Sequence, residues 1–163
     1  MTTEAKMRLH RCCFTGHRPE KLVRSEKEVK VDLHKAINQA VQDGFMVFIS
    51  GMSRGVDLWA AEIVLELQKR NPSIKLICAI PHEGFEIRWS TNWKRLYYYV
   101  RDNADLVRMI GRDYHPRVYQ IRNEWMVNHS ARVIAVFNGL ASGTKNTIDY
   151  AHQQGVPVIQ LEG

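Results

Sequence analysis

The sequence has few cysteines, no long apolar run and no metal-binding spacing, and each absence excludes a class of protein. No apolar stretch is long enough to cross a bilayer, so we expect no membrane partner. Cys12, Cys13 and Cys78 stand in apolar, strand-like runs, which favours buried, reduced thiols in a cytoplasmic protein. Because there is no Cys-x-x-Cys and no paired histidine spacing, we expect no metal site. The polar start, residues 1–6, shows no secretory pattern.

Two common nucleotide-binding motifs are also missing. There is no Gly-x-x-x-x-Gly-Lys loop and no Gly-x-Gly-x-x-Gly fingerprint, which argues against a P-loop NTPase and a dinucleotide oxidoreductase, so we expect no cofactor. Residues 51–55 do satisfy the Gly-x-Ser-x-Gly pattern of a serine hydrolase. The pattern follows only the second expected strand and no oxyanion motif precedes it, which argues against serine hydrolysis.

The length fits a single domain, residues 1–163 with a core of about 8–161. The formal net charge of +6 favours an anionic partner, whether nucleotide, nucleic acid or phosphate, without choosing among them. Strand-like and helix-like patterns alternate, which predicts an α/β Rossmann-like domain with a mostly parallel sheet and helices on both faces. The expected strands are residues 8–14, 45–49, 74–80, 105–110, 132–137 and 156–161, and the expected helices are 26–42, 56–69, 90–102, 118–128 and 144–153.

The stretch 50–57 joins an apolar strand to a helical pattern through a turn with two glycines. Gly51 and Gly55 let backbone N–H groups approach an anion closely, and Arg54 adds a charged fork. Asp57 has two open interpretations, because an acid near a helix start either complements the helix dipole or contacts a ribose or base.

Three more informative loops are expected at the same sheet edge, because ligands of such sheets bind outside the carboxyl ends of the strands. They are residues 15–19, 81–86 and 138–144. In the last of these, Ser142, Gly143 and Thr144 either cap the following helix or bind a phosphate.

A family resemblance becomes specific when five motifs are taken in order. They are Thr15-Gly16-His17-Arg18-Pro19; Ser50-Gly51-x-x-x-Gly55-Val56-Asp57-Leu58-Trp59-Ala60-Ala61-Glu62; Pro81 with Glu86 and Trp89; Arg122-Asn123; and Ser142-Gly143-Thr144-x-x-Thr147-Ile148-x-x-Ala151. Together they resemble the YpsA-like branch of the SLOG superfamily, which includes the lonely-guy phosphoribohydrolases and the DNA-processing DprA proteins. The resemblance covers about residues 8–161.

This resemblance implies a Rossmann-like fold whose glycine-rich loops hold a nucleotide or a nucleotide-derived ligand such as an ADP-ribose-type molecule. The phosphate would lie on the three glycine-bearing loops, Arg122 and Asn123 would reach phosphate or ribose, and Pro81 and Glu86 would shape the base end. The full set of expected ligand-binding residues is Gly16, His17, Arg18, Ser50, Gly51, Met52, Arg54, Gly55, Asp57, Pro81, Glu86, Arg122, Asn123, Ser142, Gly143, Thr144 and Thr147.

One position departs from the lonely-guy enzymes. Their motif has an acidic residue where this chain has Thr147, and a threonine cannot stabilise an oxocarbenium-like sugar or activate water. We therefore expect a binding protein, a sensor or sequestering module that forms a homo-oligomer, and not an enzyme. The alternative is an N-glycosidic hydrolase in which Asp57, Glu62 or Glu86 supplies the carboxylate. A second alternative is single-stranded nucleic-acid binding, because the first thirty residues are basic.

Overall fold

The computed structural model describes all residues, 1–163, as six strands and six α-helices with one short 3-10 helix. The strands are β1 (Arg11–Gly16), β2 (Val47–Ser50), β3 (Lys75–Ile80), β4 (Leu106–Met109), β5 (Arg132–Phe137) and β6 (Val158–Glu162). The helices are α1 (Thr3–Arg8), η1 (Pro19–Lys21), α2 (Glu26–Gln42), α3 (Val56–Arg70), α4 (Thr91–Asn103), α5 (Val118–Asn128) and α6 (Gly143–Gln153).

The six strands form one sheet in the order β4-β3-β2-β1-β5-β6, and every neighbouring pair is parallel. The register aligns Cys13 with Ile49 on one side and with Val133 on the other. The chain adds strands outward from β1 to β4 and then crosses to β5, so the order reverses between β1 and β5. The α/β Rossmann-like prediction is confirmed, and the sheet is parallel throughout.

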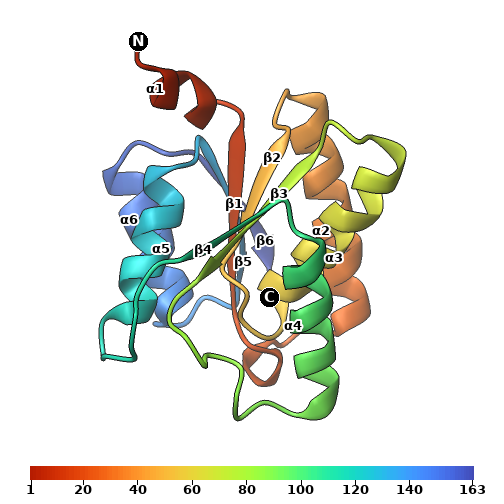
Figure 1. Ribbon diagram of the computed structural model, residues 1–163, viewed down its shortest axis with the longest axis vertical. Coiled ribbons are helices and arrows are strands. Elements are labelled where there is room, and N and C mark those ends of the chain that lie inside the picture. Colours follow the sequence, from red (N-terminus) through yellow and green to blue (C-terminus); the bar gives the residue numbers. More distant parts are fainter.

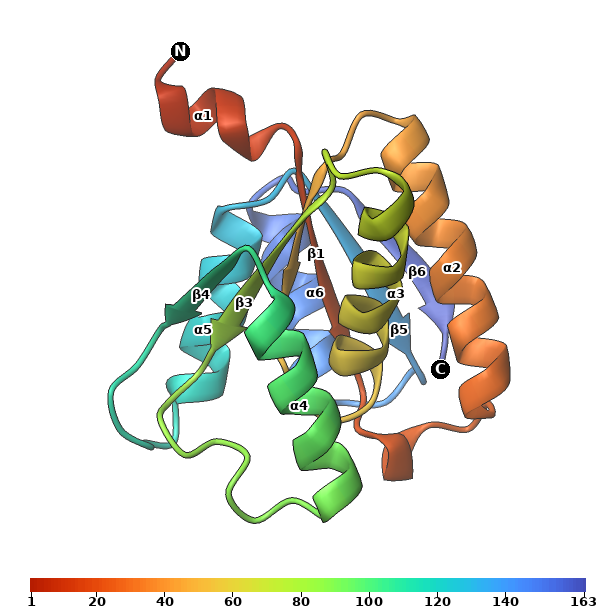
Figure 2. The ribbon, with the colours of Figure 1, turned by 45° about the vertical axis from the view of Figure 1, so that its right-hand side comes forward.

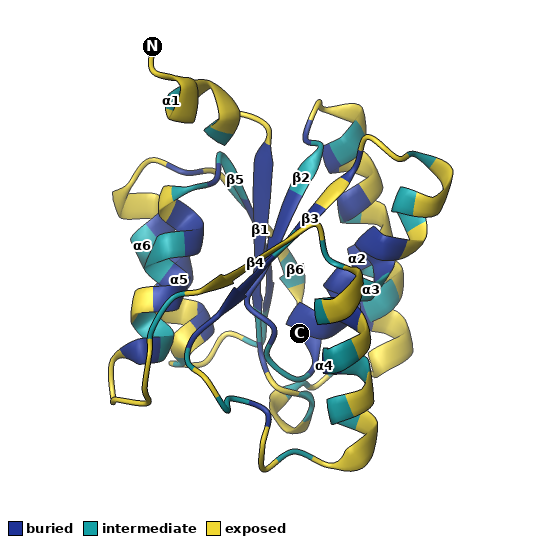
Figure 3. Ribbon diagram, viewed as in Figure 1, coloured by how far each residue is buried: buried dark blue, intermediate teal, exposed yellow.

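Helices cover both faces of the sheet. Figures 1 and 2 show α2, α3 and α4 on one face and α5 and α6 on the other. The larger apolar core lies under α2 to α4 and includes the stacked rings of Phe14 and Phe48, with centroids 5.9 Å apart. A smaller core around Ile49, Met126 and Ile148 lies under α5 and α6. The central strands are buried between these layers, whereas the edge strand β4 is exposed along its length (Figure 3).

The amino terminus corrects the sequence prediction. The expected strand from Arg8 is wrong there, because Arg8 ends α1 and β1 begins at Arg11. The Thr2 hydroxyl caps α1 by accepting the N–H of Ala5 at 3.1 Å. This short helix buries no residue of its own and projects from the end of the molecule opposite the loops that follow the strands (Figure 2). Apolar residues near it were therefore an unreliable strand signal.

The expected burial of the cysteines is confirmed, and all three thiols are free. Burial raises the pKa of Cys13 and of Cys78 to about 12. None of the helices combines the length and the apolar character that spanning a membrane requires. No group of three or more histidine, cysteine, aspartate or glutamate side chains is arranged to hold a metal ion.

Candidate ligand-binding cleft

A cleft of about 430 Å³ opens where the carboxyl ends of β1 and β2 meet the amino end of α6, beside the reversal of strand order. Ligands of open parallel sheets bind at this position. We call it the carboxyl-edge cleft. Its lining consists of Thr15, Gly16, His17, Arg18, Lys21, Ser53, Arg54, Asp57, Phe85, Trp89, Tyr119, Arg122, Asn123, Ser142, Gly143 and Thr144.

Most of the residues expected from the sequence come together in this lining. Those present are Gly16, His17, Arg18, Arg54, Asp57, Arg122, Asn123, Ser142, Gly143 and Thr144. The expected residues outside it are Ser50, Gly51, Met52, Gly55, Pro81, Glu86 and Thr147. Several of these outer residues hold the lining in place, as their contacts show.

The loop between β2 and α3 is held by its own polar side chains. The Ser50 hydroxyl donates to the carbonyl of Asp57 at 2.8 Å and accepts the N–H of Met52 at 3.2 Å. Met52 has a positive φ of 67°, and its side chain is buried in the core, so it does not line the cleft. Gly55 has a φ of 89°, and a Cβ there would lie 2.9 Å from the carbonyl oxygen of His17. Glycine at this position thus lets the first two loops approach each other.

Asp57 and Arg122 are buried charged residues in the wall of the cleft, 5% and 4% exposed. Arg122 donates from Nε to Asn123 Oδ1 at 2.8 Å and from Nη1 to the carbonyl of Gly51. Asp57 Oδ2 accepts the N–H of Ser53 at 3.3 Å, whereas Oδ1 is buried without a hydrogen-bond partner. Burial raises the pKa of the Asp57 carboxyl to about 6, and the Arg122 charge limits the rise. Each of the two residues therefore contacts the loop after β2, and one oxygen of the Asp57 carboxyl has no hydrogen-bond partner.

The amino end of α6 supplies backbone donors to the cleft. Ser142 caps the helix by accepting the N–H of Lys145 at 3.2 Å. The N–H groups of Gly143 and Thr144 belong to the first turn, where no intrahelical acceptor exists. Thr147 lies behind this turn and donates its hydroxyl to the carbonyl of Gly143 at 2.8 Å, so it braces the turn from within.

The loop after β1 forms the wall next to α6. His17 Nε2 accepts the N–H of Asn138 at 3.0 Å, which ties this loop to the one after β5. Burial lowers the pKa of His17, which keeps the ring neutral and able to accept this bond. Arg54 of the next loop pairs with Glu20 at 2.9 Å across the rim. Cationic side chains thus stand beside the backbone donors of α6.

The opposite wall of the cleft is aromatic, a feature that sequence reasoning missed. Phe85 and Trp89 pack edge to face with ring centroids 4.9 Å apart, and Tyr119 of α5 lies 5.8 Å from Phe85. Trp89 belongs to one of the five motifs of the family resemblance, but a tryptophan is more often a core residue than a ligand contact. The spacing of Tyr119, three residues before Arg122 on one helix face, was the signal that could have placed it.

The two residues expected at the base end, Pro81 and Glu86, are not part of the lining. Pro81 is buried, and its carbonyl accepts the N–H of Gly111 at 2.9 Å. Glu86 is also buried, with Oε2 lacking a hydrogen-bond partner. A direct contact of either residue with a ligand in this cleft is therefore not supported by the lining.

A second hollow of about 310 Å³ lies between α5 and the uncovered part of the sheet near β4. Its lining is mostly aliphatic, including Ile49, Ile77 and Leu106, with Arg11 at one side. Arg11 is already paired with Glu4, and Arg108 and His129 also belong to the lining. No glycine lines this hollow, whereas Gly16 and Gly143 line the carboxyl-edge cleft.

Comparison with known sequences identifies relatives along most of the chain. A family model described as the YspA SLOG family matches residues 12–156. A UPF0398 protein of Bacillus cereus strain G9842 is 32% identical over 131 residues, which cover 78% of this chain and 71% of that protein. The SPbeta prophage-derived protein YoqJ of Bacillus subtilis strain 168 is 34% identical over 116 residues, which cover 64% of this chain and 68% of that protein.

Comparison with solved structures gives the same fold. A structure of DNA processing protein A from Helicobacter pylori, described for its single-stranded DNA binding mode, aligns with a TM-score of 0.67 and 18% identity, covering 100% of this chain and 69% of that one. The X-ray structure of the structural-genomics target TM1055 aligns with a TM-score of 0.57 and 16% identity, covering 92% and 72%. At these identities the likeness extends to the fold alone.

Proposed function

The chain belongs to the YspA SLOG family, and on that premise we propose that it binds a small nucleotide or nucleotide-derived ligand in the carboxyl-edge cleft. The proposed role is that of a sensor or sequestering module that returns its ligand unchanged. The observation that carries the proposal is the convergence of two kinds of wall on one cavity. A phosphate-suited wall of cations and helix-start N–H groups faces an aromatic wall suited to a base.

The phosphate end is assigned to the first turn of α6 and the neighbouring cations. The N–H groups of Gly143 and Thr144 would donate to phosphate oxygens, and Arg18 and Lys21 would balance the charge. Arg54 would join them by exchanging its exposed partner Glu20 for the ligand. Hydrogen bonds to a charged group are worth about 1.5–3 kcal/mol each, which makes this end the main source of affinity.

Thermal unfolding in the presence of a nucleotide panel tests the proposal. A ligand at 100 times its Kd stabilises the folded chain by about 2.7 kcal/mol, which shifts the unfolding temperature measurably. The expected result is stabilisation by at least one nucleotide, recovered intact by chromatography. If no nucleotide stabilises the chain, the proposal is wrong.

A negative charge introduced into the first turn of α6 tests the proposed phosphate position, and the same charge introduced nearby is the control. In Gly143→Asp the new carboxylate would face the proposed phosphate position, and it would fold because no atom lies within 4 Å of the added Cβ. Ala141→Asp makes the same charge change two residues earlier, outside the lining. We expect only Gly143→Asp to abolish the ligand-induced stabilisation. Equal binding by both variants would show that the phosphate position is misassigned.

N-glycosidic hydrolysis is a second candidate because the cleft does contain a carboxylate. Asp57 has a pKa raised to about 6, a value suited to a general base near neutral pH. Its free oxygen is buried, however, and Arg122 beside it is already donating to the loop. Free base in the recovered mixture, lost in Asp57→Asn, would favour hydrolysis over simple binding.

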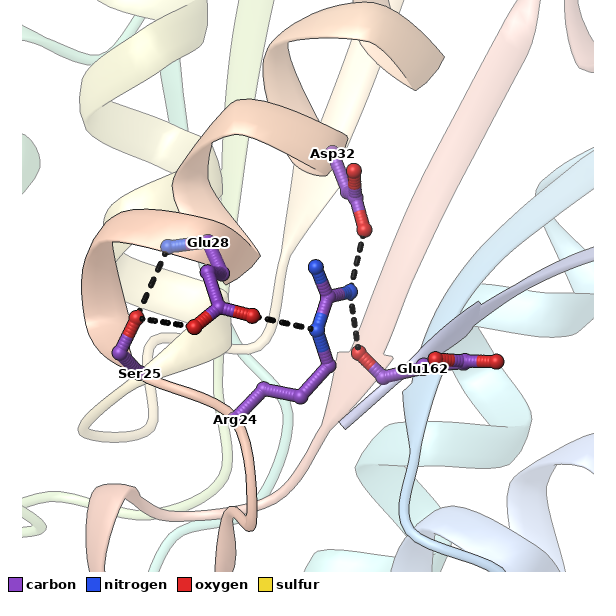
Figure 4. A network of polar contacts seen from close by, with 5 residues as sticks. All are labelled: Arg24, Ser25, Glu28, Asp32 and Glu162. Carbon is purple, nitrogen blue, oxygen red and sulfur yellow. Dashed lines mark hydrogen bonds and ion pairs between the residues drawn. The ribbon is translucent and has the colours of Figure 1, made fainter.

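Single-stranded nucleic acid is a third candidate, supported by the shared fold with DNA processing protein A. Against it, three of the basic residues in the first thirty positions, Arg11, Arg24 and Lys30, are paired with acidic side chains, and Arg18 and Lys21 line the cleft. Figure 4 shows Arg24 donating to Glu28 and Asp32. Strand binding would require a slope of log K against log salt near −0.7 per phosphate contacted. An oligonucleotide affinity without that slope would remove this candidate.

We propose further that this protein is cytoplasmic and that it forms a homo-oligomer. The three buried, unpaired thiols support a reducing compartment. The exposed edge strand β4, with Leu106, Val107 and Met109 partly open, supports pairing of copies. Sedimentation velocity at several concentrations tests the oligomer, and a single monomeric species throughout would contradict it.

A further inference from the structure

The aromatic wall of the cleft does not stop at its rim. Beyond Tyr119 and Phe85, the ring of His82 continues the row, with centroids 5.9 Å and 5.7 Å from theirs. Tyr114 follows at 5.7 Å from His82 and 6.1 Å from Tyr119. His82 and Tyr114 lie outside the cleft lining. We call His82 and Tyr114 the outer ring pair.

Tyr114 is held in place although it is exposed. Its side chain is 63% exposed, more than the 40% of Tyr99, the other exposed aromatic residue. It packs edge to face against His82, and the His82 imidazole is itself fixed, because Nδ1 donates to the carbonyl of Glu83 at 2.8 Å. The other imidazole nitrogen lies 3.4 Å from the Tyr119 hydroxyl. The outer ring pair is thus a positioned aromatic surface open to solvent.

The size of the cleft indicates which ligands could reach the outer ring pair. At about 430 Å³ the cleft stands near the lower end of the 300–1,000 Å³ range of small-molecule sites, so a ligand larger than one nucleotide extends past the rim. The aromatic side of that rim leads directly to the outer ring pair. A second planar ring leaving the cleft on this side meets a ring on which to stack.

We propose that the outer ring pair is a second base-binding subsite and that the ligand of this protein is a dinucleotide, two bases joined through phosphates. This inference rests on the proposed function, since the first base and the phosphates occupy the carboxyl-edge cleft. The inner aromatic wall takes the first base, and Tyr114 with His82 takes the second. The Tyr114 ring then sets the preference for dinucleotides over mononucleotides.

Calorimetric titration tests the inference with three probes: ADP, diadenosine diphosphate and a tetranucleotide of deoxyadenosine. The expected result is that diadenosine diphosphate binds at least about tenfold more tightly than ADP, which corresponds to about 1.4 kcal/mol. Equal affinity for both overturns the second subsite and leaves the proposed function standing. Binding of neither overturns the inference, and the proposed function is overturned as well only if no nucleotide of the thermal-unfolding panel stabilises the chain. Tighter binding of the tetranucleotide than of the dinucleotide overturns the dinucleotide assignment.

Variants of Tyr114 test whether its aromatic ring causes the preference for the dinucleotide over ADP. Tyr114→Ala should reduce the dinucleotide affinity to that of ADP without changing the ADP affinity, whereas Tyr114→Phe should keep the preference. Tyr99→Ala removes an exposed tyrosine that contacts none of these rings and should change neither affinity. A Tyr114→Ala variant that keeps the tenfold preference, or loses ADP binding equally, overturns the inference.

Discussion

The buried Asp57 carboxyl should make the stability of this protein fall as the pH rises from 4 to 7. Its pKa is about 6 in the folded chain, against an ordinary value of 3.8. The folded state therefore retains the proton to a higher pH than the unfolded state does, and Asp57 contributes stability that is complete below about pH 4 and is lost as the pH rises through 6. The pKa of Asp57 differs by about 2 units between the folded and unfolded states. At about 1.4 kcal/mol per pKa unit, this difference changes the free energy of unfolding by about 3 kcal/mol.

Urea denaturation at pH 4, 5, 6 and 7 measures this effect when the protein is compared with Asp57→Asn, whose amide cannot ionise. The unfolding free energy of the native chain minus that of the variant should fall by about 3 kcal/mol between pH 4 and pH 7. Effects of other carboxyl groups cancel in that difference. Asp102→Asn removes an exposed charge and serves as the control. If the difference for Asp57→Asn is the same at every pH, the burial argument for this carboxyl is refuted.

Three further predictions concern the loops around the cleft. Gly16→Ala should lower the free energy of unfolding by about 1–3 kcal/mol in urea, because the added Cβ would lie 2.5 Å from the Val56 Cβ; stability equal to the native value would refute the packing argument. Arg54→Ala should weaken nucleotide binding about tenfold or more in calorimetry and change stability by less than about 1 kcal/mol, since its pair with Glu20 is at the surface; unchanged affinity would remove Arg54 from the site. The His17 ring should titrate in NMR spectra with a midpoint below its ordinary value of 6.5, because burial lowers its pKa. A midpoint above that value would contradict the burial of the ring.

Local sequence patterns predicted the architecture well. Along most of the chain, the periodicity of apolar residues agreed with the residues that begin and end helices and strands. The helices 26–42 and 118–128 and the strand 132–137 have the predicted bounds. Strand order and the reversal between β1 and β5 could not come from these patterns, since pairing depends on which strands meet in three dimensions. The amino-terminal helix was missed because it depends on the Thr2 cap and one ion pair and not on a buried face.

The candidate site, too, could be predicted from the sequence only in part. Glycine and hydroxyl residues in loops were found because their spacing is local, and the fold brings Gly16, Ser142 and Gly143 to one cavity. Arg122 lines the cleft, and its role toward a ligand stays a prediction. Its hydrogen bonds to Asn123 and to the carbonyl of Gly51 could not be read from the sequence, because Gly51 lies far from it along the chain. The aromatic wall was missed because Tyr119 and Phe85 are separated in sequence and resemble ordinary core residues.

The tryptophan side chains offer the most direct measurement of where the ligand binds. The chain has four tryptophans, so a nitrogen-15 NMR spectrum contains four indole signals. Trp89 lines the carboxyl-edge cleft, Trp125 lines the hollow near β4, and Trp59 and Trp93 pack against each other. On titration with the nucleotide that stabilises the chain, the account predicts that the Trp89 indole signal shifts most. A shift confined to Trp125 would place the ligand in the other hollow and contradict the account.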